Sequence, residues 1–178
     1  MSAFHPDRPE AGEFAEYYGK YIAKAGGSAD PADPVERLAS QLKDFTTFLG
    51  GIDPAKRLYR YAEDKWSVQE MLQHMTDTER IFAYRALRIA RGDQTPLPGF
   101  DQDPYVPASE ADAANWDDLV REFSAVREST LALLRLFPQA AWTRMGTASN
   151  NPISVRAIAW ILAGHVEHHL AVLRERYL

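Results

Sequence analysis

Cysteine is absent from this chain of 178 residues, and so are long apolar runs and an excess of positive charge. The lack of cysteine rules out disulfides, thiolate metal ligands and a cysteine nucleophile. No stretch approaches the roughly 18 uncharged apolar residues that span a bilayer, and the first residues show no basic-then-apolar signal pattern. The formal net charge is −5, whereas phosphate binding requires clustered Lys and Arg. We therefore expect a cytoplasmic protein without a membrane or nucleic-acid partner.

Positive charge is nevertheless concentrated in one short strip of the chain. It consists of Arg80, Arg85, Arg88 and Arg91, which lie among acidic neighbours in one predicted helix. We interpret the strip as a solvated or partly paired helix face. Hydrophobic residues make up 46% of the chain and charged residues 25%, which is usual for globular proteins. A chain of this length can bury a substantial core, so we expect residues 1–178 to form a single domain.

Four segments repeat apolar residues at helical spacing and carry start or stop signals of helices. The second has the clearest start, because Ser67 precedes Glu70 by three residues and so forms a capping box. The segments run between Asp33-Pro34 and Gly50-Gly51, between Ser67 and Gly92, from Trp116 to Phe137 with Asn115 as its cap, and from near Asn151-Pro152 almost to the C-terminus. These four long amphipathic helices predict an all-α protein folded as a four-helix bundle.

An aromatic segment precedes the bundle. Aromatic and apolar residues recur at helical spacing over roughly Pro9–Ala25, which predicts an additional short helix outside the bundle, within an N-terminal extension of residues 1–30. The run Gly26-Gly27-Ser28 is expected to end this helix. Near the other end, the segment Gly146–Asn151 is rich in turn residues. No strand-like alternation of useful length occurs, so we expect no sheet.

A long connection joins the second and third predicted helices. The segment Gly92–Asp112 contains four prolines, which exclude a long helix. Connections this long in compact domains are usually functional or mobile. We expect this crossover loop to fold back across the open end of the bundle, with Phe100 or Tyr105 forming part of the wall of a metal pocket. The alternative is that the two rings anchor the crossover to the outer surface of the bundle or to a second subunit.

Three of the five histidines fall in the run His165-Val166-Glu167-His168-His169. At about 100° per residue, His165 and His169 share the apolar stripe of the last helix, one turn apart, whereas His168 lies at the edge of that stripe. The same projection places His74 on the apolar side of the second helix. Facing helices of a bundle often build metal sites. We therefore predict that His74, His165 and His169 bind one divalent transition metal.

The alternative is a set of hydrogen-bonded core histidines. Burying three imidazoles without a metal would require a satisfied polar network for each of them, which is costly. The histidine run is also not the metalloprotease helix motif, in which glutamate directly follows the first histidine. Glu167 comes two residues after His165 and points away from the stripe. We expect Glu167 to face solvent and do not assign it as a catalytic base.

Several short motifs along the chain occur together in one known family. They are Lys65-Trp66-Ser67, His74, Thr78-Glu79-Arg80, Arg85-Ala86-Leu87, Leu97-Pro98-Gly99-Phe100-Asp101, Gly146-Thr147-Ala148-Ser149-Asn150 and Gly164-His165-Val166-Glu167-His168-His169-Leu170. In these motifs the chain resembles cytoplasmic bacterial members of the DinB/YfiT-like superfamily, and the similarity covers essentially its whole length.

This resemblance carries its own expectations. It implies a four-helix bundle with one metal, usually zinc or nickel, held by a histidine of the second helix that matches His74 and two of the last helix that match His165 and His169. It also implies a homodimer. Some members of the family are metal-dependent thiol S-transferases that use low-molecular-weight thiols, one group isomerises a maleyl compound with a thiol, and others are called hydrolases.

Two kinds of function remain open. The first is a metal-dependent enzyme of thiol S-transferase or hydrolase type acting on a small molecule, because three neutral ligands leave a coordination position free. Without a cysteine, any thiol must come from a cosubstrate. Asp77 would orient an imidazole or a bound water, or else pair with Arg80 at the surface; Arg85 would hold an anionic substrate or a structural carboxylate. The second kind is a non-catalytic, metal-stabilised dimeric binding or sensor protein.

Overall fold

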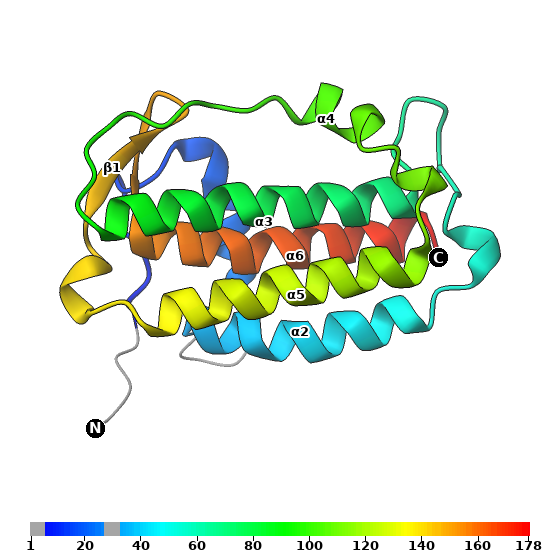
Figure 1. Cartoon of the computed structure of the whole chain (residues 1–178), viewed down its shortest axis with the longest axis horizontal. Coiled ribbons are helices and arrows are strands. Elements are labelled where there is room, and N and C mark those ends of the chain that lie inside the picture. The colour runs from blue at the N-terminus through cyan, green and yellow to red at the C-terminus, as the bar shows by residue number, and fades with distance from the viewer. Residues whose placement is uncertain (1–5, 27–32) are drawn as a thin grey trace.

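Four long helices lie side by side in the computed structural model, which describes residues 6–26 and 33–178 (Figure 1). They are α2 (Pro34–Gly50), α3 (Val68–Ala90), α5 (Trp116–Arg135) and α6 (Val155–Arg176). Both α2 and α3 pack against α5 and α6, so the order around the bundle is α2–α5–α3–α6. The predicted all-α four-helix bundle is confirmed. Within the described residues, no helix is both long enough and apolar enough to cross a membrane.

The direction of the helices explains the long crossover. Neighbouring helices α3 and α5 run in the same direction in Figure 1, whereas α6 runs opposite to α3. A connection between parallel neighbours must return along the whole bundle, which is about 35 Å for a helix of this length. Residues 91–115 do this along the side of α3, rather than over the open end of the bundle as expected (Figure 1).

The crossover also contains a short helix, α4 (Gln102–Ala108), which the sequence did not predict. Asp101 begins α4 by accepting a hydrogen bond from the Asp103 amide at 3.1 Å. Pro104 lies in the first turn, where a missing N–H costs nothing. Pro107 falls inside α4, where it removes one backbone donor, and the helix ends one residue later at Ala108. The prolines therefore exclude a long helix but not this short one, and α4 packs on α3.

Local capping signals set the ends of the long helices. The Asp33 carboxylate accepts a hydrogen bond from the Val35 amide at 2.9 Å, and both hydrogen bonds of the predicted capping box between Ser67 and Glu70 are present. The last helix is the exception. It begins at Val155 rather than near Asn151-Pro152, with the Ser154 hydroxyl as its cap, because the preceding residues form a strand.

That strand belongs to a small hairpin that the sequence analysis missed. Strands β1 (Met145–Ala148) and β2 (Asn151–Ser154) pair antiparallel, and each is too short to show alternation. The two turn residues, Ser149 and Asn150, have φ of 53° and 61°, the left-handed conformation of a two-residue hairpin turn. The crossover joins this hairpin, because the Leu97 amide donates to the Thr147 carbonyl at 2.9 Å.

The aromatic N-terminal segment forms less helix than expected. A 3-10 turn (Glu16–Tyr18) leads into α1 (Gly19–Ala25), which packs on α6 with Tyr21 and Ile22 buried. At the crossing point a Cβ on Gly164 would lie 1.8 Å from the Tyr21 carbonyl oxygen, so only glycine permits this approach. Of the predicted helix-ending run, Gly27 and Ser28 lie outside the described residues.

The core divides into two apolar clusters, one toward each end of the bundle. The buried polar and charged residues of the helices include Gln41, Glu79, Arg127 and the histidines at 74, 165 and 169. Burying such groups is costly unless they bind one another or a ligand. These buried polar side chains are therefore the candidates for a functional site.

Candidate metal centre

Three histidines converge in the interior of the bundle. His74 comes from α3, and His165 and His169 lie one turn apart on α6. The Nε2 atom of His165 is 3.2 Å from that of His74 and 3.0 Å from that of His169. The three residues are 5%, 6% and 8% exposed. Their ligand atoms all lie within 4.8 Å of one another, which is a suitable arrangement for a metal ion.

The hydrogen-bonding capacity of the rings argues for a cation between them. A ring nitrogen carries either one proton or one lone pair, so Nε2 of His165 can complete one good hydrogen bond but not two. Nδ1 of His169 is buried without a hydrogen-bond partner. Three nitrogens bound tetrahedrally at about 2.0–2.1 Å would be about 3.3 Å apart, close to the observed separations. The residues present therefore fit a bound metal.

Burial also keeps the imidazoles in the form that coordinates. Desolvation lowers the pKa of His74 to about 4. The same effect, together with the neighbouring histidines, lowers the pKa of His165 and His169 well below the usual value. Only a neutral imidazole has a lone pair to offer a metal. The triad is therefore ready to bind a cation at neutral pH.

A buried ion pair supports the triad from the other helices. Arg127 of α5 donates from Nε and Nη2 to the two carboxylate oxygens of Glu79 on α3, at 2.7 and 2.6 Å. Its third nitrogen donates to the Leu38 carbonyl and the Gln41 side chain of α2. Sequence reasoning missed this network. The sequence signal that could have shown it is a charged residue on each apolar stripe. Glu79 follows Met75 by four residues, and Arg127 follows Phe123 by four.

The network continues to the histidine helix through Glu167. The Gln41 amide donates to the Ala163 carbonyl at 2.9 Å and to Oε1 of Glu167 at 2.7 Å, and Arg37 donates to the same oxygen at 2.6 Å. Glu167 does point away from the triad as expected. It does not face open solvent, however, because α2 covers that side of α6 and supplies these two donors.

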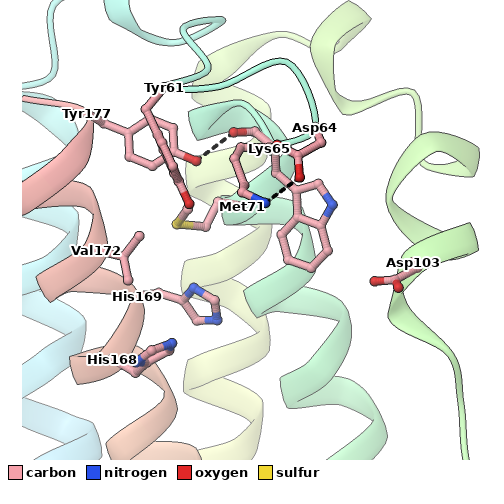
Figure 2. Close-up of a pocket in the computed structure, with 10 residues that line it drawn as sticks. Tyr61, Asp64, Lys65, Met71, Asp103, His168, His169, Val172 and Tyr177 are labelled. Atoms are coloured by element: carbon pink, nitrogen blue, oxygen red, sulfur yellow. Dashed lines mark hydrogen bonds and ion pairs between the residues drawn. The ribbon is translucent and has the colours of Figure 1, made fainter.

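A wide pocket of about 540 Å³ opens on one side of the triad (Figure 2). Figure 2 shows His168 and His169 projecting from α6, while Asp103 faces them from the crossover. His168, at the stripe's edge as expected, is half-buried and lines this pocket rather than joining the triad. The pocket walls are Tyr61, Asp64, Lys65, Trp66, Met71, Asp103, His168, His169, Val172 and Tyr177.

A narrow pocket of about 250 Å³ opens on the other side, where His74 and His165 form part of its wall. Phe100 lines this pocket, so the expectation that a ring of the crossover forms part of the wall beside the histidines is confirmed for Phe100. Tyr105 contacts Phe100 at 5.8 Å between ring centroids but is half exposed and does not line the pocket. Asp103 lines both pockets.

The N-terminal helix contributes to the site, which the sequence analysis did not foresee. Tyr21 lines the narrow pocket, and its ring lies 5.4 Å from those of both His165 and His168. Its place depends on Gly164, which directly precedes the first histidine of α6 and lets α1 approach. Helical spacing alone could not show which face of α6 this segment would cover.

Two residues singled out in the sequence lie elsewhere than proposed. Asp77 lies beside Asp118 and Glu122 of α5. Within its own helix it accepts a hydrogen bond from Gln73 at 3.0 Å and lies 3.9 Å from Arg80, which matches the surface alternative and not a role at the triad. Arg85 does not belong to a solvated face, because the crossover and the hairpin cover it to 2% exposure. Within the described residues it makes no ion pair with a structural carboxylate.

Comparisons with known proteins agree with this architecture. Residues 37–173 match the family model described as "DinB superfamily". A protein of Oceanobacillus iheyensis named "Putative metal-dependent hydrolase OB0413" is 23% identical over 148 residues, covering 80% of this chain and 84% of that protein. A solved structure described as "YfiT from Bacillus subtilis is a probable metal-dependent hydrolase with an unusual four-helix bundle topology" has a TM-score of 0.68 at 16% identity. It covers 94% of this chain and 89% of that one, and shows the fold.

Proposed function

The chain belongs to the DinB superfamily, and on this premise we propose that it is a metal-dependent enzyme that acts on a small molecule. His74, His165 and His169 hold one divalent transition metal. Zinc or nickel suits a site made of imidazole nitrogens. The homodimer and the cytoplasmic location that the family resemblance implies are part of the same proposal.

The observation that carries this proposal is the incomplete ligand set of the triad. Among the described residues, only the three histidines join the cluster, whereas structural zinc sites usually have four protein ligands. The triad also borders both pockets, through His169 on one side and through His74 and His165 on the other. A site with a free coordination position and access from two sides suits catalysis better than structural support.

The two pockets favour transfer between a thiol cosubstrate and a second molecule. Asp64 and Lys65 give the wide pocket groups of both charge signs, which suits a zwitterionic low-molecular-weight thiol. The narrow pocket is lined mainly by aromatic and hydroxyl groups and would take the electrophile. When bound, a divalent metal at such a site acidifies a thiol or a water in its free position.

In the transfer reaction the thiol loses its proton, its sulfur forms a bond to an electrophilic carbon, and the leaving group departs with the electron pair of the broken bond. Asp103 is the carboxylate that lines both pockets, and we assign it as the proton acceptor. Phe100 and Tyr21 restrict access of water to the narrow pocket, which lowers the local dielectric around the reacting groups.

Hydrolysis is the second candidate, because both relatives described above carry names of metal-dependent hydrolases. In that reaction a water takes the place of the thiol. The wide pocket would then hold part of a single larger substrate, and Asp103 would accept the proton of the water.

One experiment tests both candidates. The protein is prepared metal-free and zinc-loaded, then given an electrophilic aryl halide with a low-molecular-weight thiol, or an activated ester without thiol. Zinc-dependent loss of thiol, reduced in Asp103→Asn, supports transfer. Zinc-dependent ester cleavage without thiol consumption supports hydrolysis instead. Asp77→Asn, which alters a carboxylate outside both pockets, is the matched control and should keep the activity. If a fully zinc-loaded protein shows neither reaction, the enzymatic proposal is wrong.

A further inference from the structure

Arg85 is a buried cation next to the narrow pocket. The residue is 2% exposed, and its Nη2 donates to the Pro98 carbonyl at 2.9 Å and to the Ser149 hydroxyl at 3.0 Å. Its guanidinium lies 4.9 Å from the Phe82 ring centroid and 5.7 Å from that of Phe100. All the described partners of this guanidinium are therefore neutral groups or aromatic rings.

This environment differs from that of the other buried arginine of the core. Arg127 forms a two-pronged ion pair with Glu79, whereas no carboxylate forms an ion pair with Arg85 within the described residues. Among the described residues, the titratable group that faces Arg85 is the Tyr18 phenol. Burial disfavours the charged guanidinium and lowers its pKa. A buried charge without a counter-charge is costly. A ligand that supplies the missing negative charge would remove that cost.

The groups that contact Arg85 also form the wall of the narrow pocket. Tyr18, Phe82, Phe100 and Ser149 all line it. The Ser149 hydroxyl accepts its hydrogen bond from Arg85, so its own proton is free to point at a ligand. Its position is fixed by the hairpin turn, in which Ser149 adopts φ of 53°.

A second hydroxyl lies in the same pocket without a partner. Thr78 is 5% exposed and lines the pocket, and its Oγ1 is buried without a hydrogen bond. Two carboxylates, Asp101 and Asp103, also line the pocket, but both are exposed. Solvent and salt screen exposed charges far more than buried ones. The buried end of the pocket is therefore electropositive and offers hydroxyl donors.

We propose that the narrow pocket binds the carboxylate end of a small organic acid, with the Ser149 hydroxyl as donor and Arg85 as the counter-charge behind it. The other end of the acid reaches His74 and His165. This inference names the substrate class of the proposed enzyme. It rests on the proposed function only in treating the bound acid as a substrate.

The spacing along α3 limits the length of the acid. His74 and Arg85 lie about three turns apart on one face, or about 16 Å along the helix axis. Long side chains on a helix lean toward its N-terminus, and this lean shifts His74 and Arg85 alike, so it does not shorten their separation. The Ser149 hydroxyl, which would contact the carboxylate, stands between Arg85 and the pocket. The acid therefore has to span only from the histidines to Ser149, a distance on the order of 10 Å that suits a chain of about six carbons.

The first test needs no metal. Hexanoate and 1-hexanol have the same chain length and differ in charge, and their binding to the metal-free protein is measured by thermal shift and calorimetry. We expect hexanoate to bind about tenfold more tightly than hexanol, as for a charge-assisted hydrogen bond. Arg85→Gln should abolish this preference, Ser149→Ala should reduce it, and Arg80→Gln, which removes an exposed arginine paired with Glu122, should leave it unchanged.

The second test uses zinc-loaded protein with 6-mercaptohexanoate and 6-mercaptohexanol, whose thiols can bind the metal. We expect the carboxylate again to add about tenfold in affinity in the wild type and nothing in Arg85→Gln. If neither thiol binds better with zinc than without it, the proposed function fails while the hexanoate result still decides the anion site.

Equal affinity for hexanoate and hexanol in the wild type would overturn the inference, even if Arg85→Gln fails to fold. A carboxylate preference that persists undiminished in folded Arg85→Gln would also overturn it. Arg85→Lys keeps the positive charge without the planar fork, so it should retain part of the preference, and its complete loss there would contradict a role for the charge.

Discussion

Removing the Arg127 side chain should destabilise the bundle far more than removing an exposed arginine of the same helix. In Arg127→Met, the Glu79 carboxylate loses both of its donors, at 2.7 and 2.6 Å, while it remains buried at 2% exposure. Breaking a buried pair in this way costs about 3–5 kcal/mol. For a protein of this size, each kcal/mol lowers Tm by about 2–4 °C, so we expect Tm to fall by roughly 6–20 °C.

The assay is urea and thermal unfolding followed by circular dichroism. Arg121→Met is the matched control, because Arg121 pairs with Asp118 in the same helix but its side chain is 74% exposed. We expect that control to change the free energy of unfolding by less than about 0.5 kcal/mol. The double variant Arg127→Met with Glu79→Leu removes both charges and should recover most of the lost stability.

A loss in Arg127→Met no larger than in Arg121→Met would refute this reasoning. The reasoning would also be refuted if the double variant lost as much free energy of unfolding as Arg127→Met and Glu79→Leu lose together as single variants. The destabilisation would then not come from the unpaired charge. The same network reaches Gln41 and, through it, Glu167 between the histidines of α6. We therefore also expect Arg127→Met to weaken zinc binding, as measured by competition with a chelator.

Three further predictions concern the surroundings of the triad. Gly164→Ala should destabilise the protein by about 1–3 kcal/mol in urea unfolding, because its methyl group would collide with the Tyr21 carbonyl; unchanged stability would contradict the close packing of α1. Phe100→Ala should weaken small-molecule binding far more than zinc binding, both followed by calorimetry, and equal losses would argue against Phe100 as a pocket wall. The metal-free protein should lose stability as pH falls from about 6.5 to about 4. The pKa of histidine in the unfolded chain is about 6.5, whereas burial lowers the pKa of His74 in the folded protein to about 4. The unfolded chain then takes up a proton that the folded one refuses, and a free energy of unfolding that stays constant between pH 7 and pH 4 would exclude this coupling.

Features that depend on local spacing could be predicted from the sequence. The helix start at Ser67 follows from a capping box, and the convergence of His165 and His169 follows from their separation by one turn on the apolar stripe. His74 lies on the apolar side of α3, so it meets the other two histidines once α3 and α6 are neighbours in the bundle. Local chemistry therefore fixed the elements and the three histidines of the site.

Features that depend on contacts between distant segments could not be predicted. The hairpin strands are four residues each, too short to show a period, and their turn is stabilised partly by the crossover. The pairing of Glu79 with Arg127 joins residues of different helices, and no spacing within either helix shows it. The burial of Arg85 arises in the same way, because the crossover and the hairpin cover a helix face that would otherwise be solvated.

The central claim is that three particular histidines hold one metal ion. Its most direct test is the metal content of the wild type, His169→Ala and His168→Ala, measured by inductively coupled plasma mass spectrometry after equilibration with zinc and removal of the free ion. We predict one zinc per chain in the wild type and in His168→Ala, because His168 lies outside the triad, and almost none in His169→Ala. Zinc retained by His169→Ala and lost from His168→Ala, or no zinc in the wild type, would contradict the account.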